Sequence, residues 1–193
     1  MSARRPRIVV VTGVPGSGKT TLATELARAL RVPFLARDDV RGGLFFTAGV
    51  WTDEVDRVPS ADEAVEVFLQ TVEGLLAHGV SCVVEYVVRV HRPADLERLM
   101  AAGDCVVVIT GCADASGRVA RRNLADRFVA NPALLAAAGV ESVEAHTEVV
   151  VARMQEVERE MRRDFPLPVL HVDTSGDLRP GIDEIVAFAT RVA

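Results

Sequence analysis

Two patterns of hydrophobic and polar positions alternate along the chain. Short apolar runs, rich in β-branched residues, predict buried strands at residues 8–12, 34–36, 80–84, 106–110 and 168–172. Between these runs, apolar residues recur every three or four positions, which is typical of helices that bury one face. Such helices are predicted at residues 21–30, 61–78, 94–102, 143–163 and 182–192. A capping box, Ser60 with Glu63, marks the start of the second of them.

The alternation of strands and helices indicates an α/β fold. Strands joined by helices form a parallel sheet, and helices that cover both of its faces give three layers. At 193 residues the chain fits one domain of ordinary size, so a single α/β/α domain is expected over residues 1–193. Ligands of such sheets bind at the carboxyl ends of the strands, and polar residues follow most of these strands.

The glycine-rich segment after the first predicted strand carries the strongest motif. Residues 13–20 read GVPGSGKT and match the P-loop pattern G-x-x-x-x-G-K-[ST] at every fixed position. A strand that turns through glycines into a helix N-terminus forms an anion site from backbone N–H groups. Lys19 is expected to reach the β- and γ-phosphates, and the Thr20 hydroxyl to bind Mg²⁺. The predicted site for ATP or GTP comprises Gly13, Pro15, Gly16, Ser17, Gly18, Lys19, Thr20 and Thr21.

Carboxylates follow the second and third predicted strands. Asp38 and Asp39 lie where an acceptor would approach the γ-phosphate, and a carboxylate there can take the proton of an attacking hydroxyl. Asp38 is the predicted base and Asp39 an acceptor contact; the alternative for the pair is a helix N-cap with a first-turn carboxylate. Arg41 is expected to hold an anionic or polar group of the acceptor. Glu85 occupies the place of a Walker B acid, to serve the metal through a water or to contact the acceptor instead.

Four arginines lie in the helical region between the fourth and fifth predicted strands. They occupy the place where nucleotide kinases carry a mobile lid, here about residues 113–140. An arginine that stabilises the transferred phosphoryl group is worth about 10³–10⁵ in rate. The alternative is a solvated helix face for at least two of the four. They are Arg118, assigned to the nucleotide, and Arg121, Arg122 and Arg127.

Residues 42–51 combine glycines with three aromatic side chains. Their weak periodicity predicts an irregular or briefly helical surface segment. The aromatic residues Phe45, Phe46 and Trp51 could wall a pocket for a partly apolar acceptor. They could also stack bases or pack in the core. Phe46 and Trp51 are assigned here to the acceptor pocket.

The composition of the chain argues against some classes of binding partner. The formal net charge of −5 and a single lysine argue against nucleic acid and against anionic membrane surfaces. The apolar runs are too short to span a bilayer, and no apolar stretch typical of a signal peptide follows the N-terminal arginines. Three cysteines without metal-ligand spacing favour a reduced, cytoplasmic protein. The histidines, His78, His91, His146 and His171, are scattered and are interpreted as structural.

The P-loop together with the sequence RDDVR at residues 37–41 resembles the small P-loop kinases related to phage polynucleotide kinase and chloramphenicol phosphotransferase. The resemblance spans nearly the whole chain. It implies a five-stranded parallel sheet in the order 2-3-1-4-5, with a helical lid. It also implies Asp38 as the base, Arg41 as an acceptor contact and Arg122 with Arg127 in the lid. The closing VDTSG segment implies that Thr174 and Ser175 lie beside the adenine, whereas Glu85 departs from the usual Asp.

These residues predict an ATP- and Mg²⁺-dependent kinase. The γ-phosphate would move to a hydroxyl of a small-molecule acceptor, such as an antibiotic, a nucleoside or another metabolite. Two alternatives stay open: a polynucleotide 5′-hydroxyl kinase, and a nucleotide-dependent switch or ATPase that has no acceptor. A switch would need neither an acceptor base nor a closing lid. The identity of the acceptor and the oligomeric state are left open.

Overall fold

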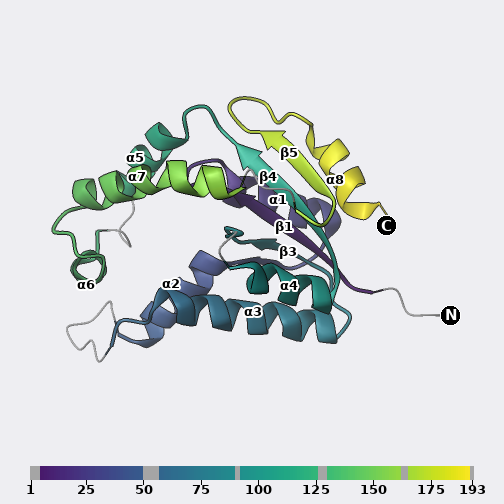
Figure 1. Cartoon of the computed structure of the whole chain (residues 1–193), viewed down its shortest axis with the longest axis horizontal. Helices are drawn as coiled ribbons and strands as arrows, with labels where there is room; N and C mark the ends of the chain where they lie inside the picture. The colour runs from purple at the N-terminus through teal and green to yellow at the C-terminus, as the bar shows by residue number, and fades with distance from the viewer. Residues whose placement is uncertain (1–4, 50–56, 90–91, 126–129, 162–164, 192–193) are drawn as a thin grey trace.

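A five-stranded parallel sheet forms the centre of the molecule (Figure 1). The computed structural model describes residues 5–49, 57–89, 92–125, 130–161 and 165–191. The strand order is β2-β3-β1-β4-β5, which confirms the predicted order and fold class. The strands are β1 (Arg7–Gly13), β2 (Phe34–Ala36), β3 (Cys82–Glu85), β4 (Asp104–Gly111) and β5 (Val169–Asp173).

Helices cover both faces of the sheet because its central strand, β1, buries side chains on both sides. Val9 and Val11 of β1 pack toward α1 (Lys19–Leu30) and α8 (Ile182–Thr190). Ile8 and Val10 pack on the opposite face, toward α3 (Ala61–Ala77) and α4 (Pro93–Ala102). All four side chains are buried, as expected of strands in a parallel sheet. The result is the three-layer arrangement.

The predicted start and buried face of α3 are both present. The Ser60 hydroxyl accepts a hydrogen bond of 3.0 Å from the backbone N–H of Glu63, as in a capping box. The stripe that the spacing predicts faces the sheet and is fully buried at Phe68, Leu69 and Val72. Burial of a large apolar side chain contributes about 1.5–3 kcal/mol, so this face fixes α3 against the sheet.

Residues 42–47, for which the sequence predicts an irregular or briefly helical segment, are helical. The helix α2 (Arg37–Thr47) runs without interruption through Gly42 and Gly43. Glycine costs a helix about 1 kcal/mol relative to alanine, but Phe45 is fully buried, and burial of its ring outweighs that preference. Tertiary packing therefore decides the conformation of this segment.

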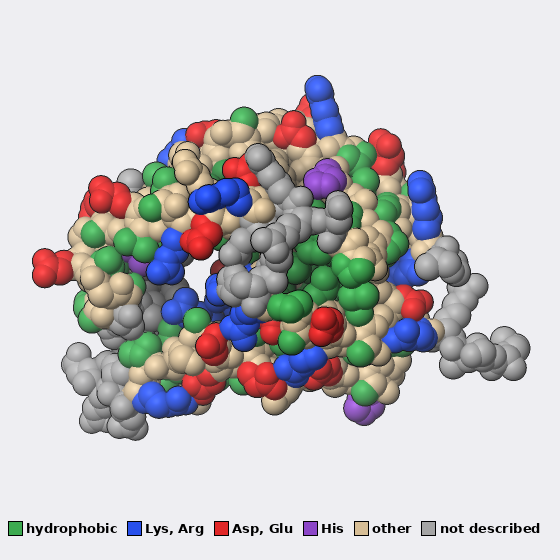
Figure 2. Space-filling view, in the orientation of Figure 1, with side chains coloured by type: hydrophobic (Ala, Val, Ile, Leu, Met, Phe, Trp, Pro, Cys, Tyr) green, Lys and Arg blue, Asp and Glu red, His purple; other side chains and the backbone are tan. Residues whose placement is uncertain are grey.

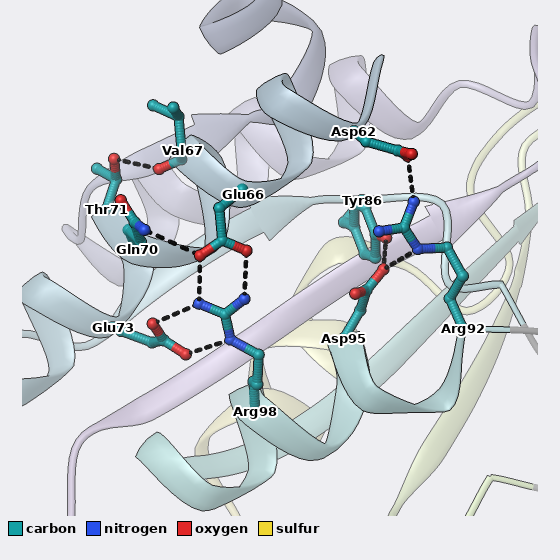
Figure 3. A network of polar contacts seen from close by, with 10 residues as sticks. All are labelled: Asp62, Glu66, Val67, Gln70, Thr71, Glu73, Tyr86, Arg92, Asp95 and Arg98. Carbon is teal, nitrogen blue, oxygen red and sulfur yellow. Dashed lines mark hydrogen bonds and ion pairs between the residues drawn. The ribbon is translucent and has the colours of Figure 1, made fainter. Parts of the chain in front are cut away.

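A polar network joins α3 to α4 and to the residue that follows Glu85 (Figure 3). Arg98 of α4 pairs with Glu66 and Glu73 of α3, with both shortest contacts at 2.7 Å. Tyr86, which is buried, donates a hydrogen bond to Asp95. Burial, and then the hydrogen bond to Asp95, raises the pKa of Tyr86. These contacts anchor the chain just beyond the carboxyl end of β3.

The region predicted to form a lid is helical. It contains α5 (Ala115–Ala125) and α6 (Pro132–Ala137), and α5 packs against α7 (Val143–Met161) through Val119 and Met154. In Figure 1, these helices extend together beyond the carboxyl ends of the strands, away from α8. Among the residues described, no helix has both the length and the apolar character needed to cross a membrane.

Candidate active site

The P-loop lies between the end of β1 and the start of α1, as the motif predicts. Gly13 and Gly16 are both essential to its path. A Cβ on Gly13 would lie 2.3 Å from the Thr110 hydroxyl, and one on Gly16 would lie 2.2 Å from the carbonyl oxygen of Ala115. Gly16 also has a φ of +78°, which side-chain-bearing residues rarely adopt. The segment thus folds as a tight backbone loop at the N-terminus of α1, the arrangement that binds phosphate.

Hydrogen bonds between buried polar groups connect the P-loop to the ends of β1 and β4. The Ser17 and Thr110 hydroxyls lie 2.6 Å apart, and Thr110 donates to the carbonyl oxygen of Thr12 at 3.1 Å. Thr12 in turn accepts a 3.2 Å hydrogen bond from the backbone N–H of Val88. Sequence reasoning did not identify Thr12 or Thr110 as site residues. Their only signal was a hydroxyl at the end of an otherwise apolar strand.

Thr174 and Ser175, which follow β5, make backbone contacts at the same edge. The Thr174 hydroxyl lies 2.7 Å from the carbonyl oxygen of Ser17 and 3.0 Å from that of Gly111. The Ser175 hydroxyl accepts a 3.0 Å hydrogen bond from the backbone N–H of Ala113. These two residues therefore connect the P-loop, β4 and the start of α5. Their contact with a nucleotide stays a prediction.

Lys19 and Glu85 form a buried pair at the centre of the site. The Lys19 Nζ lies 4.0 Å from Glu85 Oε1 and donates a 3.0 Å hydrogen bond to the carbonyl oxygen of Val14. Burial lowers the pKa of Lys19, and the Glu85 charge opposes this shift. Burial likewise raises the pKa of Glu85, opposed by Lys19 and by a hydrogen bond with Thr20. Bound phosphates would add further negative charge beside Lys19.

The neighbourhood of Thr20 fits a magnesium ion that is shared with a nucleotide. Thr20 is exposed at the start of α1, and its hydroxyl reaches Glu85. Mg²⁺ in such sites takes one or two protein oxygen ligands and completes its shell with phosphates and water. Within the described residues, no group of three or more His, Cys, Asp or Glu side chains could hold a metal. The oxygen ligands present therefore suit Mg²⁺ that arrives with a nucleotide.

Asp38 and Asp39 lie in the first turn of α2, and neither acts as its N-cap, which is Ala36. Asp38 is exposed over 72% of its side chain and pairs with Arg37 at 3.0 Å. Its charge influences the pKa values of both Lys19 and Glu85, so it lies near the P-loop. Asp39 also acts on Glu85. Since β2 ends at Ala36 in register with Glu85, and Glu85 is in register with Val11 of β1, the exposed Asp38 carboxylate follows β2 at the edge of the sheet that carries the P-loop.

The other residues that the sequence predicts to bind the acceptor lie in different environments. The Arg41 guanidinium lies over the ring of Phe45, 4.9 Å from its centroid. Phe45 has a core role, whereas Phe46 is 75% exposed. Trp51 lies outside the described residues. An acceptor contact for Phe46 or Trp51 stays a prediction.

The arginines of α5 point to different partners. Arg118 donates a 2.8 Å hydrogen bond to the carbonyl oxygen of Thr174, and Arg121 pairs with Asp114 at 2.8 Å. Arg122 donates to the Asn123 side chain at 3.2 and 3.3 Å. After burial, the positive charge of Arg122 also lowers the pKa of Lys19, so Arg122 lies within electrostatic range of the P-loop. Arg127 lies outside the described residues.

A cavity of about 760 Å³ opens beside the P-loop. It lies where the ends of β4 and β5 meet α5 and α7, and Val14 of the P-loop forms part of its wall. Other lining residues are Cys112, Met154, His171 and Ser175. Its volume lies in the range of small-molecule sites.

Several solved structures share this fold over nearly the whole chain. A protein from Chloroflexus aurantiacus, provisionally named a kinase, is 23% identical, with a TM-score of 0.63 and coverage of 96% of this chain and 97% of that one. A sugar kinase from Janibacter is 20% identical, with a TM-score of 0.55 and coverage of 95% and 92%. Shikimate kinase from Acinetobacter baumannii is 19% identical, with a TM-score of 0.55 and coverage of 94% and 89%.

A chain of the Pnkp1/Rnl/Hen1 RNA repair complex also has this fold. It is 18% identical, with a TM-score of 0.56, and the match covers 85% of this chain and 48% of that one. A comparison with curated proteins by sequence found no match. The AAA_18 family, described as an AAA domain, matches residues 9–164, a span that runs from β1 beyond the end of α7. The chain therefore belongs to the AAA_18 family and has the fold of the P-loop kinases.

Proposed function

We propose that the protein is an ATP- and Mg²⁺-dependent kinase whose acceptor is a hydroxyl group of a small molecule. One observation carries the proposal: the accessible carboxylate of Asp38 lies near Lys19, the central cation of the P-loop. A nucleotide switch needs the P-loop but has no use for a carboxylate aimed at an acceptor. The small-molecule kinases among the structural neighbours support the same class of reaction.

The residues of the site have distinct roles in this reaction. Lys19 and the backbone N–H groups of the P-loop hold the phosphates, and Lys19 stabilises the charge that grows on the transferred group. Mg²⁺ bound near Thr20 and Glu85 would supply further neutralisation of phosphate charge. The cavity beside Val14 is the proposed place for the nucleoside of ATP.

The proposed reaction transfers one phosphoryl group to the acceptor and one proton from the acceptor hydroxyl. The acceptor oxygen forms a bond to the γ-phosphorus while the bond from that phosphorus to the β,γ-bridging oxygen breaks, and ADP leaves. Asp38 takes the hydroxyl proton, which a general base positioned at the acceptor does in kinases. Arg122 of α5 is assigned to stabilise the phosphoryl group during transfer.

Acceptor-dependent ADP release tests the proposal. The protein is incubated with ATP and Mg²⁺ alone, and then with a panel of hydroxyl-bearing sugars, sugar acids, nucleosides and antibiotics. A kinase should hydrolyse ATP slowly alone and faster with its acceptor, and excess chelator should abolish both rates. Fast hydrolysis that no acceptor changes would favour the switch or ATPase. Salt-sensitive phosphorylation of 5′-hydroxyl oligonucleotides would favour the polynucleotide kinase, which the net charge of −5 argues against.

A further inference from the structure

A buried carboxylate, Asp95, lies at the centre of a polar network to which the proposed reaction gives no role (Figure 3). Asp95 is 7% exposed, and its Oδ2 atom accepts the hydrogen bond from Tyr86 and lies 3.2 Å from Arg92 Nε. Arg92 also pairs with Asp62 of α3. Asp95 belongs to the first turn of α4, where the helix dipole favours a carboxylate. The network thus joins α3 and α4 to the residue that follows Glu85.

The Tyr86 hydroxyl has a purpose beyond packing. The ring of Tyr86 stacks on that of Phe68, with centroids 5.5 Å apart and an angle of 22° between the planes. A phenylalanine would make the same contact without placing a hydroxyl beside a buried carboxylate. A buried charged group adds little net stability, because its loss of solvation offsets the attraction of its partners. Directional hydrogen bonds do fix geometry, so the hydroxyl contributes to the exact position of residue 86.

The position of residue 86 bears directly on Glu85, because the sheet ends there. Glu85 is the last residue of β3, in register with Val11 of β1 on one side and with Ala36, the last residue of β2, on the other. The backbone N–H of Tyr86 continues this pairing with a 3.2 Å hydrogen bond to the carbonyl oxygen of Val11. Tyr86 is therefore held by α4 through its side chain and by β1 through its backbone.

Glu85 lies where a small displacement would matter. Its carboxylate, 11% exposed, is 4.0 Å from Lys19 Nζ and has a hydrogen bond with Thr20. Figure 2 shows the surface hollowed between the α7 side and the α2 side, with Lys and Arg side chains gathered around the hollow. Such side chains suit phosphates, whereas Mg²⁺ requires oxygen ligands in near-ideal octahedral geometry. A carboxylate that serves this ion, directly or through a water, needs a backbone that is held in place.

We propose that Tyr86 and Asp95 are positioning residues for Mg²⁺ binding, because they fix the carboxyl end of β3 and so hold the Glu85 carboxylate beside Thr20. This inference rests on the proposed function, in which Mg²⁺ binds near Thr20 and Glu85. Tyr86 is 3% exposed and packs on the α3 side of the sheet, so it acts through Glu85 and not by contact with the ion. Residues that support a metal ligand from outside the site typically contribute about 10–100-fold in metal affinity.

The experiment measures how strongly Mg²⁺ tightens nucleotide binding. The dissociation constant of the fluorescent analogue mant-AMP-PNP is measured by anisotropy in excess EDTA and in excess Mg²⁺, and the ratio of the two values is the magnesium gain. Partial unfolding changes both constants alike, so the gain does not respond to a loss of stability alone. Circular dichroism establishes that each variant is folded.

The variants separate the hydroxyl from the rest of the α3–α4 interface. Tyr86→Phe keeps the stacked ring and removes the hydroxyl, and Asp95→Asn keeps an oxygen that can accept from Tyr86. Glu85→Gln removes the carboxylate through which Tyr86 is proposed to act. Arg98→Gln is the matched control, because Arg98 joins the same two helices through Glu66 and Glu73.

Mg²⁺ should tighten nucleotide binding to the wild-type protein, and Glu85→Gln should reduce the magnesium gain. Tyr86→Phe should lower the gain about tenfold, Asp95→Asn should lower it less, and Arg98→Gln should change it by less than about twofold. In the Glu85→Gln background, Tyr86→Phe should change the gain by less than about twofold, because the residue that it positions is already altered.

Three results would overturn the inference while the proposed function stands: a gain that Tyr86→Phe leaves unchanged, an equal loss in Arg98→Gln, or a Tyr86→Phe effect that persists in the Glu85→Gln background. A gain that Glu85→Gln leaves unchanged would also overturn it, because Glu85 would then not serve the ion. A wild-type protein that binds the nucleotide equally well in EDTA would refute the Mg²⁺ dependence of the proposed kinase, and this inference with it.

Discussion

Removal of the Thr110 hydroxyl should destabilise the protein, because this hydroxyl connects the P-loop to β4. Thr110 is 2% exposed, and its hydroxyl contacts the Ser17 hydroxyl and the carbonyl oxygen of Thr12. Thr110→Val keeps the shape of the side chain but leaves both groups without this partner, and Ser17 is fully buried. An unsatisfied buried polar group costs about 1–3 kcal/mol. We therefore expect a loss of about 2 kcal/mol in the free energy of unfolding.

The loss is measured by urea unfolding followed by circular dichroism. For a protein of this size, about 2 kcal/mol also corresponds to a fall of roughly 4–8 °C in melting temperature. Thr71→Val is the matched control, since Thr71 is exposed on α3 and donates only to the carbonyl oxygen of Val67, at 2.7 Å. Water can replace that contact, so the control should change stability by less than about 0.5 kcal/mol.

A double variant separates a lost hydrogen bond from a general packing defect. Removing both partners of a buried hydrogen bond leaves fewer unsatisfied groups than removing one. Ser17→Ala combined with Thr110→Val should therefore cost less than the sum of the two single variants, by about 0.5 kcal/mol or more. Thr110→Val should also weaken ATP binding, because Ser17 belongs to the P-loop. Additive costs, or a Thr110→Val variant as stable as Thr71→Val, would refute this account of the loop.

Three further predictions concern the reaction and the cavity. Lys19→Ala should abolish phosphoryl transfer while the protein remains folded, because the charge that Lys19 neutralises grows in the transition state; near-normal turnover would exclude Lys19 from the catalytic centre. Asp38→Asn should lower kcat by roughly 10²–10⁴ with little change in ATP affinity, and Asp39→Asn should do less; a reversed order would exchange their roles. Burial raises the pKa of Cys82 to about 11 and that of Cys105 to about 12, so at pH 8 a thiol reagent should modify Cys112 first, ATP should slow this modification, and Cys112→Ser should remove it. Rapid modification of the Cys112→Ser variant would contradict the raised pKa values of the other two thiols.

Much of the architecture could be predicted from the sequence because its signals are local. The apolar runs that form the strands are contiguous, and the capping box of α3 joins residues only three positions apart. The P-loop is a continuous motif whose glycines and lysine specify both backbone and chemistry. The order of the strands came from a resemblance to known kinases, and the structure confirms it.

Tertiary structure decided the features that depend on distant residues. The sequence left open whether residues 42–47 are irregular or briefly helical, and α2 continues through Gly42 and Gly43 because Phe45 is buried against the rest of the fold. The contact between Ser17 and Thr110 joins residues 93 positions apart, so no local pattern could reveal it. The spacing of apolar residues indicates which face of a helix or strand is buried. Which element packs against that face depends on residues far away in the sequence, and so on the tertiary structure.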